Sequence, residues 1–136
     1  MELHSKNGTH FTLHLINHQN IEFYLDNIHP SFYNLCYAHQ ADYARVHLLY
    51  KYGGIYFDSD VLIMNNLNEV YNLLDTYEGF FIQTETVDKI TNAVLCSRPQ
   101  TKLYKLWCER IKQILDQSMD GKIGWTAIGT YILIDF

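Results

Sequence analysis

Residues 48–61 read LLYKYGGIYFDSDV, and this stretch decides how the rest of the chain is interpreted. Gly53–Gly54 predicts the end of a preceding helix, because helix C-termini commonly need a residue with positive φ. The triplet at 55–57, IYF, favours a β-strand. Asp58 and Asp60 follow that strand directly. Helix, glycine turn, strand and a pair of carboxylates therefore form one continuous unit.

The helix before this turn follows Pro30. Its apolar or small residues recur at spacings of four, three, four and four, which predicts one buried stripe: Tyr37, Ala41, Ala44, Leu48 and Tyr52. Asp42 and Arg45 lie three residues apart on the same helix and share a face. Such a pair is commonly a surface salt bridge. The short chain distance to Asp58 favours the alternative, in which Asp42 and Arg45 face the same cavity as Asp58.

The other segments alternate between strand-like and helix-like patterns. We expect strands at 11–16, 80–82 and 93–95, and helices at 21–25, 70–74 and 101–117. The last helix carries one apolar face, formed by Leu103, Trp107, Ile111 and Leu115. This alternation predicts the α/β fold class, and the length of 136 residues predicts a single domain over 1–136.

Composition excludes several classes of protein. The net charge of −5 provides no basic face, so we expect no nucleic-acid partner. Cys36, Cys96 and Cys108 have no metal-ligand spacing and suit small apolar positions, which favours a reducing compartment. No apolar run is long enough to span a bilayer, and residues 1–5 do not begin a signal peptide. We therefore expect a cytoplasmic location.

Asp58 and Asp60 have a direct chemical use. Side chains alternate along an extended chain, so we expect both carboxylates to point to one site. A hard divalent cation relieves the repulsion between them and keeps positions open for phosphate oxygens. The ordinary alternative is a solvated turn. The apolar strand before Asp58, and the close backbone approach that Gly53–Gly54 permits, favour the metal site.

Residues 41–45, ADYAR, together with 48–61, closely resemble the signature of the DXD-motif sugar transferases. This family includes capsular-polysaccharide sugar transferases and the fungal Golgi initiating mannosyltransferase, and large clostridial toxins share its glucosyltransferase core. Weaker similarity extends to 11–25 and 92–99. The resemblance implies a GT-A-like (Rossmann-like) fold, Mn²⁺ or Mg²⁺, and a UDP- or GDP-hexose donor. It also implies transfer to a glycan or protein acceptor with retention at the anomeric carbon.

The resemblance also implies roles for individual residues. Asp60 would be the direct metal ligand, and Asp58 would contact the ribose or reach the metal through water. Asp58, Asp60 and Gly54 would together bind the nucleotide diphosphate. Asp42 and Arg45 would hold the donor sugar. No carboxylate is assigned as a catalytic nucleophile.

Two features depart from the family pattern. No base-binding strand precedes Phe11, and Ile128–Gly129–Thr130 is a trace of the Gly-Pro segment that the family carries near its acceptor region. We therefore expect a fold that is incomplete at both ends. An unpaired sheet edge in such a fold would promote self-association, and nucleotide affinity would be weak.

Two alternatives remain open. One is a truncated or inactive transferase domain that binds its partner or nucleotide without turnover. The other is a haloacid-dehalogenase-like phosphatase, in which Asp58 would be the nucleophile and Lys89 the later lysine. Trp125 is a further candidate for stacking on a sugar or base, although core packing explains it equally well.

Overall fold

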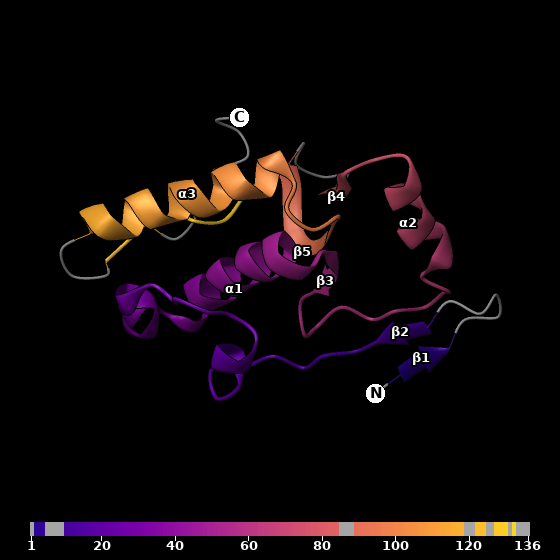
Figure 1. Cartoon of the computed structure of the whole chain (residues 1–136), viewed down its shortest axis with the longest axis horizontal. Helices are drawn as coiled ribbons and strands as arrows, with labels where there is room; N and C mark the ends of the chain where they lie inside the picture. Colours follow the sequence, from indigo (N-terminus) through magenta and orange to yellow (C-terminus); the bar gives the residue numbers. More distant parts are fainter. Residues whose placement is uncertain are drawn as a thin grey trace.

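The computed structural model describes residues 2–4, 10–84, 89–118, 122–124, 127–130 and 132. Its elements, in chain order, are β1 (Glu2–His4), β2 (His10–Thr12), η1 (Ile21–Phe23), η2 (Pro30–Asn34), α1 (Tyr37–Tyr52), β3 (Gly54–Phe57), α2 (Asn68–Asn72), η3 (Leu73–Asp75), β4 (Gly79–Thr84), β5 (Lys89–Ser97) and α3 (Lys102–Gln117). In Figure 1, α1 and α3 lie side by side at one end of the molecule, while α2 and the β1–β2 pair lie at the other. The main sheet lies between these two ends.

The main sheet has the strand order β3-β5-β4, and β5 pairs antiparallel with both neighbours. The predicted mixture of helices and strands is confirmed. However, every strand pairing within the described residues is antiparallel, unlike the mainly parallel sheet of a Rossmann-like fold. The physical reason is the connection, because β4 leads into β5 without the crossover helix that a parallel neighbour requires. The GT-A-like topology stays a prediction.

Helix α1 confirms the predicted helix, and Ala44 and Leu48 pack against the core as predicted, but the predicted burial of Tyr37 and Tyr52 is wrong. Tyr37 is 80% exposed and Tyr52 is 51% exposed, whereas the buried residues are His39, Asp42, Tyr43, Arg45, Val46 and Leu49. The spacing argument treated tyrosines as buried and charged residues as exposed. A tyrosine tolerates water at its hydroxyl end, and a charged residue can be buried where it is paired.

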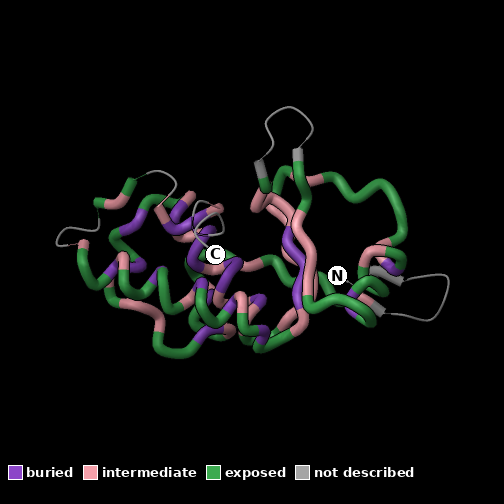
Figure 2. Tube along the Cα trace, turned by 90° about the horizontal axis from the view of Figure 1, so that it is seen from above, coloured by how far each residue is buried: buried purple, intermediate pink, exposed green. Residues whose placement is uncertain are grey.

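The core lies between α1, α3, η2 and the C-terminal turn at 127–130. Figure 2 shows buried residues concentrated in the part of the molecule that holds these helices. Trp107 on α3 is fully buried, and its Nε1 donates a hydrogen bond to the Ile128 carbonyl at 3.2 Å. The predicted apolar face of α3 is confirmed at Trp107, Ile111 and Leu115, but Tyr104 replaces Leu103 in the core.

The predicted boundaries are less accurate in the short elements. The strand expected at 11–16 ends at Thr12, and the helix expected at 21–25 is the single 3₁₀ turn η1. Leu13 and Leu15 are exposed after β2, so alternating apolar residues there do not mark a buried strand. None of the helices in the described part of the chain is long and apolar enough to cross a bilayer.

Candidate donor-binding site

The glycine turn connects α1 to β3 as the sequence predicts. Gly53 has a φ of 67°, and its N–H donates to the Leu49 carbonyl at 2.9 Å, which ends the helix. A Cβ at Gly53 would lie 2.7 Å from Pro99 Cδ, so the backbone approach there is close. Gly54 has a φ of 98° but no atom within 4 Å of an added Cβ, so conformation alone requires that glycine.

The Asp58–Asp60 segment is a turn and not an extended strand end. The Asp58 N–H donates to the Ala93 carbonyl at 2.8 Å, which extends the pairing of β3 with β5 by one residue. The Val61 N–H then donates back to the Asp58 carbonyl at 3.1 Å. The alternation argument is therefore wrong for this pair, because the chain reverses immediately after Asp58. Asp58 is partly buried, whereas Asp60 is exposed.

Arg45 contacts both Asp42 and Asp58 and so connects three of the predicted site residues. Its Nη2 lies 3.2 Å from Asp58 Oδ1 and 3.4 Å from Asp42 Oδ1. Nη1 donates to the Asn92 carbonyl at 2.6 Å, and Nε donates to the Ala41 carbonyl at 3.2 Å. Arg45 is only 5% exposed. The prediction that Asp42 and Arg45 do not form a surface pair is confirmed, and Arg45 also contacts Asp58; a cavity shared by the three residues stays a prediction.

Two residues that the sequence argument missed complete this cluster. The Tyr56 hydroxyl donates to Asp58 Oδ1 at 2.8 Å, and the Arg45 guanidinium lies 4.8 Å from the centre of the Tyr56 ring. Asn92 Nδ2 donates to Asp42 Oδ1 at 2.7 Å. Tyr56 was detectable, because residues two apart on a strand share a face. Asn92 begins the weakly similar segment 92–99, but the sequence did not indicate its contact with Asp42, because Asn92 lies on β5, far from Asp42 in the chain.

Burial and charge act together in this cluster. Burial raises the pKa of Asp42, and the nearby Arg45 and His39 partly oppose that rise. Burial is also the main reason that the pKa of Tyr56 is raised, so its hydroxyl remains a neutral donor toward Asp58. One guanidinium serves two carboxylates, and the exposed Asp60 follows Asp58 by two residues along the chain.

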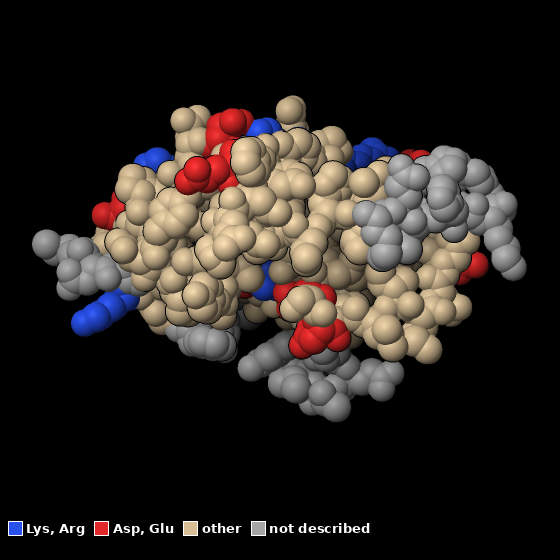
Figure 3. Space-filling view, turned by 90° about the horizontal axis from the view of Figure 1, so that it is seen from below, with Lys and Arg blue, Asp and Glu red and all other residues tan. Residues whose placement is uncertain are grey.

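Metal binding by Asp58 and Asp60 stays a prediction. Asp60 is exposed and forms no ion pair or hydrogen bond within the described residues, whereas Asp58 Oδ1 is contacted by Arg45 and Tyr56. Figure 3 shows acidic atoms gathered beside a hollow near the middle of one face, with basic atoms visible inside it. Within the described residues, no group of three or more His, Cys, Asp or Glu is arranged to hold a metal. Two carboxylates suit Mg²⁺ or Mn²⁺ when phosphate oxygens and water supply the remaining ligands.

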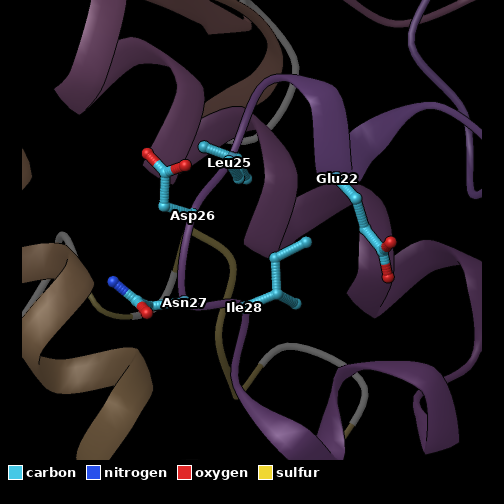
Figure 4. Close-up of a pocket in the computed structure, with 5 residues that line it drawn as sticks. All are labelled: Glu22, Leu25, Asp26, Asn27 and Ile28. Carbon is cyan, nitrogen blue, oxygen red and sulfur yellow. The ribbon is translucent and has the colours of Figure 1, made fainter.

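Two surface pockets lie apart from this cluster. One, of about 440 Å³, is lined by Glu22 on η1 and by Leu25, Asp26, Asn27 and Ile28 on the segment that follows it (Figure 4). The other, of about 750 Å³, lies between η2, α1 and α3, and its lining includes Tyr43, His47 and Cys108. His47 stacks on Tyr43 and donates from Nδ1 to the Tyr43 carbonyl at 2.8 Å. His47 therefore belongs to a different surface from Asp42 and Arg45.

Two candidates from the sequence cannot be placed. Trp125 lies outside the described residues, and only the backbone of Lys89 is described, within β5.

Comparison with known proteins places the chain in a family. Residues 3–78 match the family described as a glycosyltransferase sugar-binding region containing a DXD motif. Lactosylceramide 4-alpha-galactosyltransferases from Pan troglodytes and Homo sapiens are each 30% identical over 90 residues, covering 50% of this chain and 25% of the relative. The chain thus spans about a quarter of the length of these relatives, and no solved structure matches it.

The family match includes all the predicted site residues, Asp42, Arg45, Gly54, Asp58 and Asp60. It also covers more than half of the 136 residues. The phosphatase alternative is therefore set aside, and the chain belongs to the glycosyltransferases whose sugar-binding region contains the DXD motif.

Proposed function

We propose that this chain binds a nucleoside-diphosphate hexose and supports transfer of the hexose to a glycan or protein acceptor, with retention at the anomeric carbon. The observation that carries this proposal is the Arg45 bridge, which joins Asp42 on α1 to Asp58 at the end of β3. A buried arginine shared by two carboxylates holds both in fixed positions beside the exposed Asp60. Such preorganisation is what a donor site requires.

Asp42 and Arg45 are proposed to hold the donor sugar. Asp42 Oδ1 faces both Arg45 and Asn92, at 3.4 and 2.7 Å. The carboxylate is thereby oriented, and an ionised carboxylate accepts hydrogen bonds from sugar hydroxyls. Arg45 holds this arrangement through its bonds to the Asn92 and Ala41 carbonyls.

Asp60 is proposed to bind Mn²⁺ or Mg²⁺ directly, with Asp58 acting through water or on the ribose. When bound, the cation would neutralise the charge that develops on the departing diphosphate. Tyr56 donates a hydrogen bond to Asp58 Oδ1 and Arg45 pairs with the same oxygen, so the two residues orient the Asp58 carboxylate. Gly54 leaves open space beside β3, which suits an approaching diphosphate.

The donor and metal are tested together by measuring hydrolysis of a panel of UDP- and GDP-hexoses, with and without Mn²⁺. Transfer of the hexose is then measured with a panel of acceptors. This panel includes lactosylceramide, since the relatives are named for that acceptor. We expect metal-dependent release of one hexose, lost in Asp60→Asn and retained in Asp75→Asn, an exposed aspartate on η3. Hydrolysis that is equal without metal, or that survives Asp60→Asn, would contradict the proposal.

Binding is measured in parallel by thermal shift, so that a chain without turnover still gives a result. Donor binding without hydrolysis would support the alternative of a binding-only transferase domain. A chain that binds no nucleotide sugar in the presence of Mn²⁺ would refute both readings.

A further inference from the structure

The C-terminal turn at 127–130 lies outside the part of the chain that matches the family, which ends at residue 78. Three bonds hold this turn. Trp107 Nε1 donates to the Ile128 carbonyl at 3.2 Å, the Ala127 N–H donates to the Gly124 carbonyl at 2.9 Å, and the Ile132 N–H donates to the Gly129 carbonyl at 3.2 Å. Ile128 is fully buried in the core. The turn is thus anchored on α3 and presents Gly129 to α1 and β5.

Gly129 packs directly against the donor site. A Cβ at this position would lie 3.2 Å from Asp42 Oδ2, 3.4 Å from Asp42 Cγ and 3.3 Å from Asn92 Nδ2. The positive-φ glycines among the described residues are Gly53 and Gly54, so Gly129 has ordinary backbone geometry. A side chain at 129 is therefore opposed by the limited space and not by the backbone conformation.

The two oxygens of Asp42 have different surroundings. Arg45 and Asn92 both approach Oδ1, whereas Oδ2 is the Asp42 atom that a Cβ at position 129 would meet at 3.2 Å. Rotation about the Cβ–Cγ bond of an aspartate moves both oxygens, so the two partners of Oδ1 hold the carboxylate plane and direct Oδ2 toward Gly129. The absence of a side chain at Gly129 leaves the space in which Oδ2 lies.

We propose that Gly129 is a positioning residue for the donor sugar. By leaving room for Oδ2, it allows the Asp42 carboxylate to keep the direction in which it accepts sugar hydroxyls. This inference rests on the proposed function, in which Asp42 holds the donor sugar. With Gly129 included, the donor site is formed by residues of α1, β3, β5 and the C-terminal turn.

The test compares Gly129→Ala with Gly124→Ala. Gly124 is a matched control, because it lies in the same segment and an added Cβ there would meet no atom of the described residues within 4 Å. The affinity of each variant is measured with Mn²⁺ for the preferred nucleotide sugar and for the corresponding nucleoside diphosphate without sugar. A displacement of Asp42 by a few tenths of an ångström is expected to weaken nucleotide-sugar binding by roughly 3- to 10-fold.

The distinguishing result is the difference between the change in affinity for the nucleotide sugar and the change in affinity for the nucleoside diphosphate. Gly129→Ala should weaken binding of the nucleotide sugar while leaving affinity for the bare diphosphate unchanged, and Gly124→Ala should change neither. Equal loss for both ligands, or no loss for either, would overturn the positioning role. If the wild-type chain binds neither ligand, the proposed function fails first and the positioning role fails with it.

A stability measurement covers the case in which Gly129→Ala unfolds under assay conditions. The same substitution is made in an Asp42→Ala chain, where the atoms that an added Cβ meets at 3.2 and 3.4 Å are gone. If the contact with Asp42 is what excludes a side chain at 129, the decrease in melting temperature should be at least halved in this background. An undiminished decrease would overturn the inference.

Discussion

Replacing Arg45 with Met should be among the most damaging single changes to the folded state. The side chain of Arg45 is 6% exposed, and the paired side chains of Asp42 and Asp58 are 10% and 30% exposed. Removing one member of a buried ion pair leaves uncompensated charge and typically costs about 3–5 kcal/mol. Asp58 contributes less than Asp42 to this free-energy cost, because Asp58 is partly exposed and solvent screens its charge.

We therefore expect Arg45→Met to reduce the free energy of unfolding by about 3–4 kcal/mol. For a chain of this size, that corresponds to a fall in melting temperature of about 10–15 °C. Arg45→Lys should recover part of the loss. It keeps the charge, but it lacks the planar fork that contacts Asp42, Asp58 and the Asn92 carbonyl together.

The assay is thermal and urea unfolding at pH 7, followed by circular dichroism. Lys51→Met is the matched control, because Lys51 lies on the same helix and pairs with Asp26 at 2.6 Å in an exposed position. Exposed pairs contribute little to stability, so this control should remain close to the wild type. If Arg45→Met destabilises the chain no more than Lys51→Met, the reasoning about the buried cluster is refuted.

The pH dependence gives a second check on the same variant. Burial raises the pKa of Asp42 above its usual value of 3.8, and removing Arg45 takes away the main opposing influence. A carboxyl whose pKa is raised in the native state stabilises the fold at low pH, and this contribution is lost as pH rises through the native pKa. The difference in free energy of unfolding between wild type and Arg45→Met should therefore become smaller as pH falls from 7 toward 4. A difference in unfolding free energy that stays constant over this range would contradict that account.

Three further predictions concern single positions. Mn²⁺ with a nucleoside diphosphate should raise the melting temperature of the wild type but not of Asp60→Asn, since a ligand stabilises the state that binds it; a full shift in the variant would contradict metal binding by Asp60. Asn92→Ala removes the 2.7 Å hydrogen bond to a buried carboxylate and should cost about 1–3 kcal/mol in urea unfolding; an unchanged midpoint would show that Asn92 does not support Asp42. Gly53→Ala and Gly54→Ala are both strained by positive φ, but only at Gly53 would the new Cβ lie 2.7 Å from Pro99. Gly53→Ala should therefore lower the melting temperature more than Gly54→Ala. Equal decreases in melting temperature would show that the contact with Pro99 does not matter.

The sequence by itself determined the local unit from the helix to the aspartates. The glycine pair predicted the end of α1, the apolar triplet predicted β3, and the 41–45 segment with the Asp58–Asp60 pair carried the family resemblance. These predictions succeeded because each depends on neighbours within a few residues. Helix termination, strand propensity and a contiguous motif are all encoded over such short distances.

The tertiary structure alone decided how that unit is completed. Asn92 and Gly129 reach Asp42 from distant parts of the chain, and the apolar periodicity of α1 did not indicate that Asp42 and Arg45 are buried. A charged side chain is buried only where its partners are supplied, and those partners come from β3, β5 and the C-terminal turn. The direction of Asp60 likewise depends on the turn after Asp58, so strand alternation could not predict it.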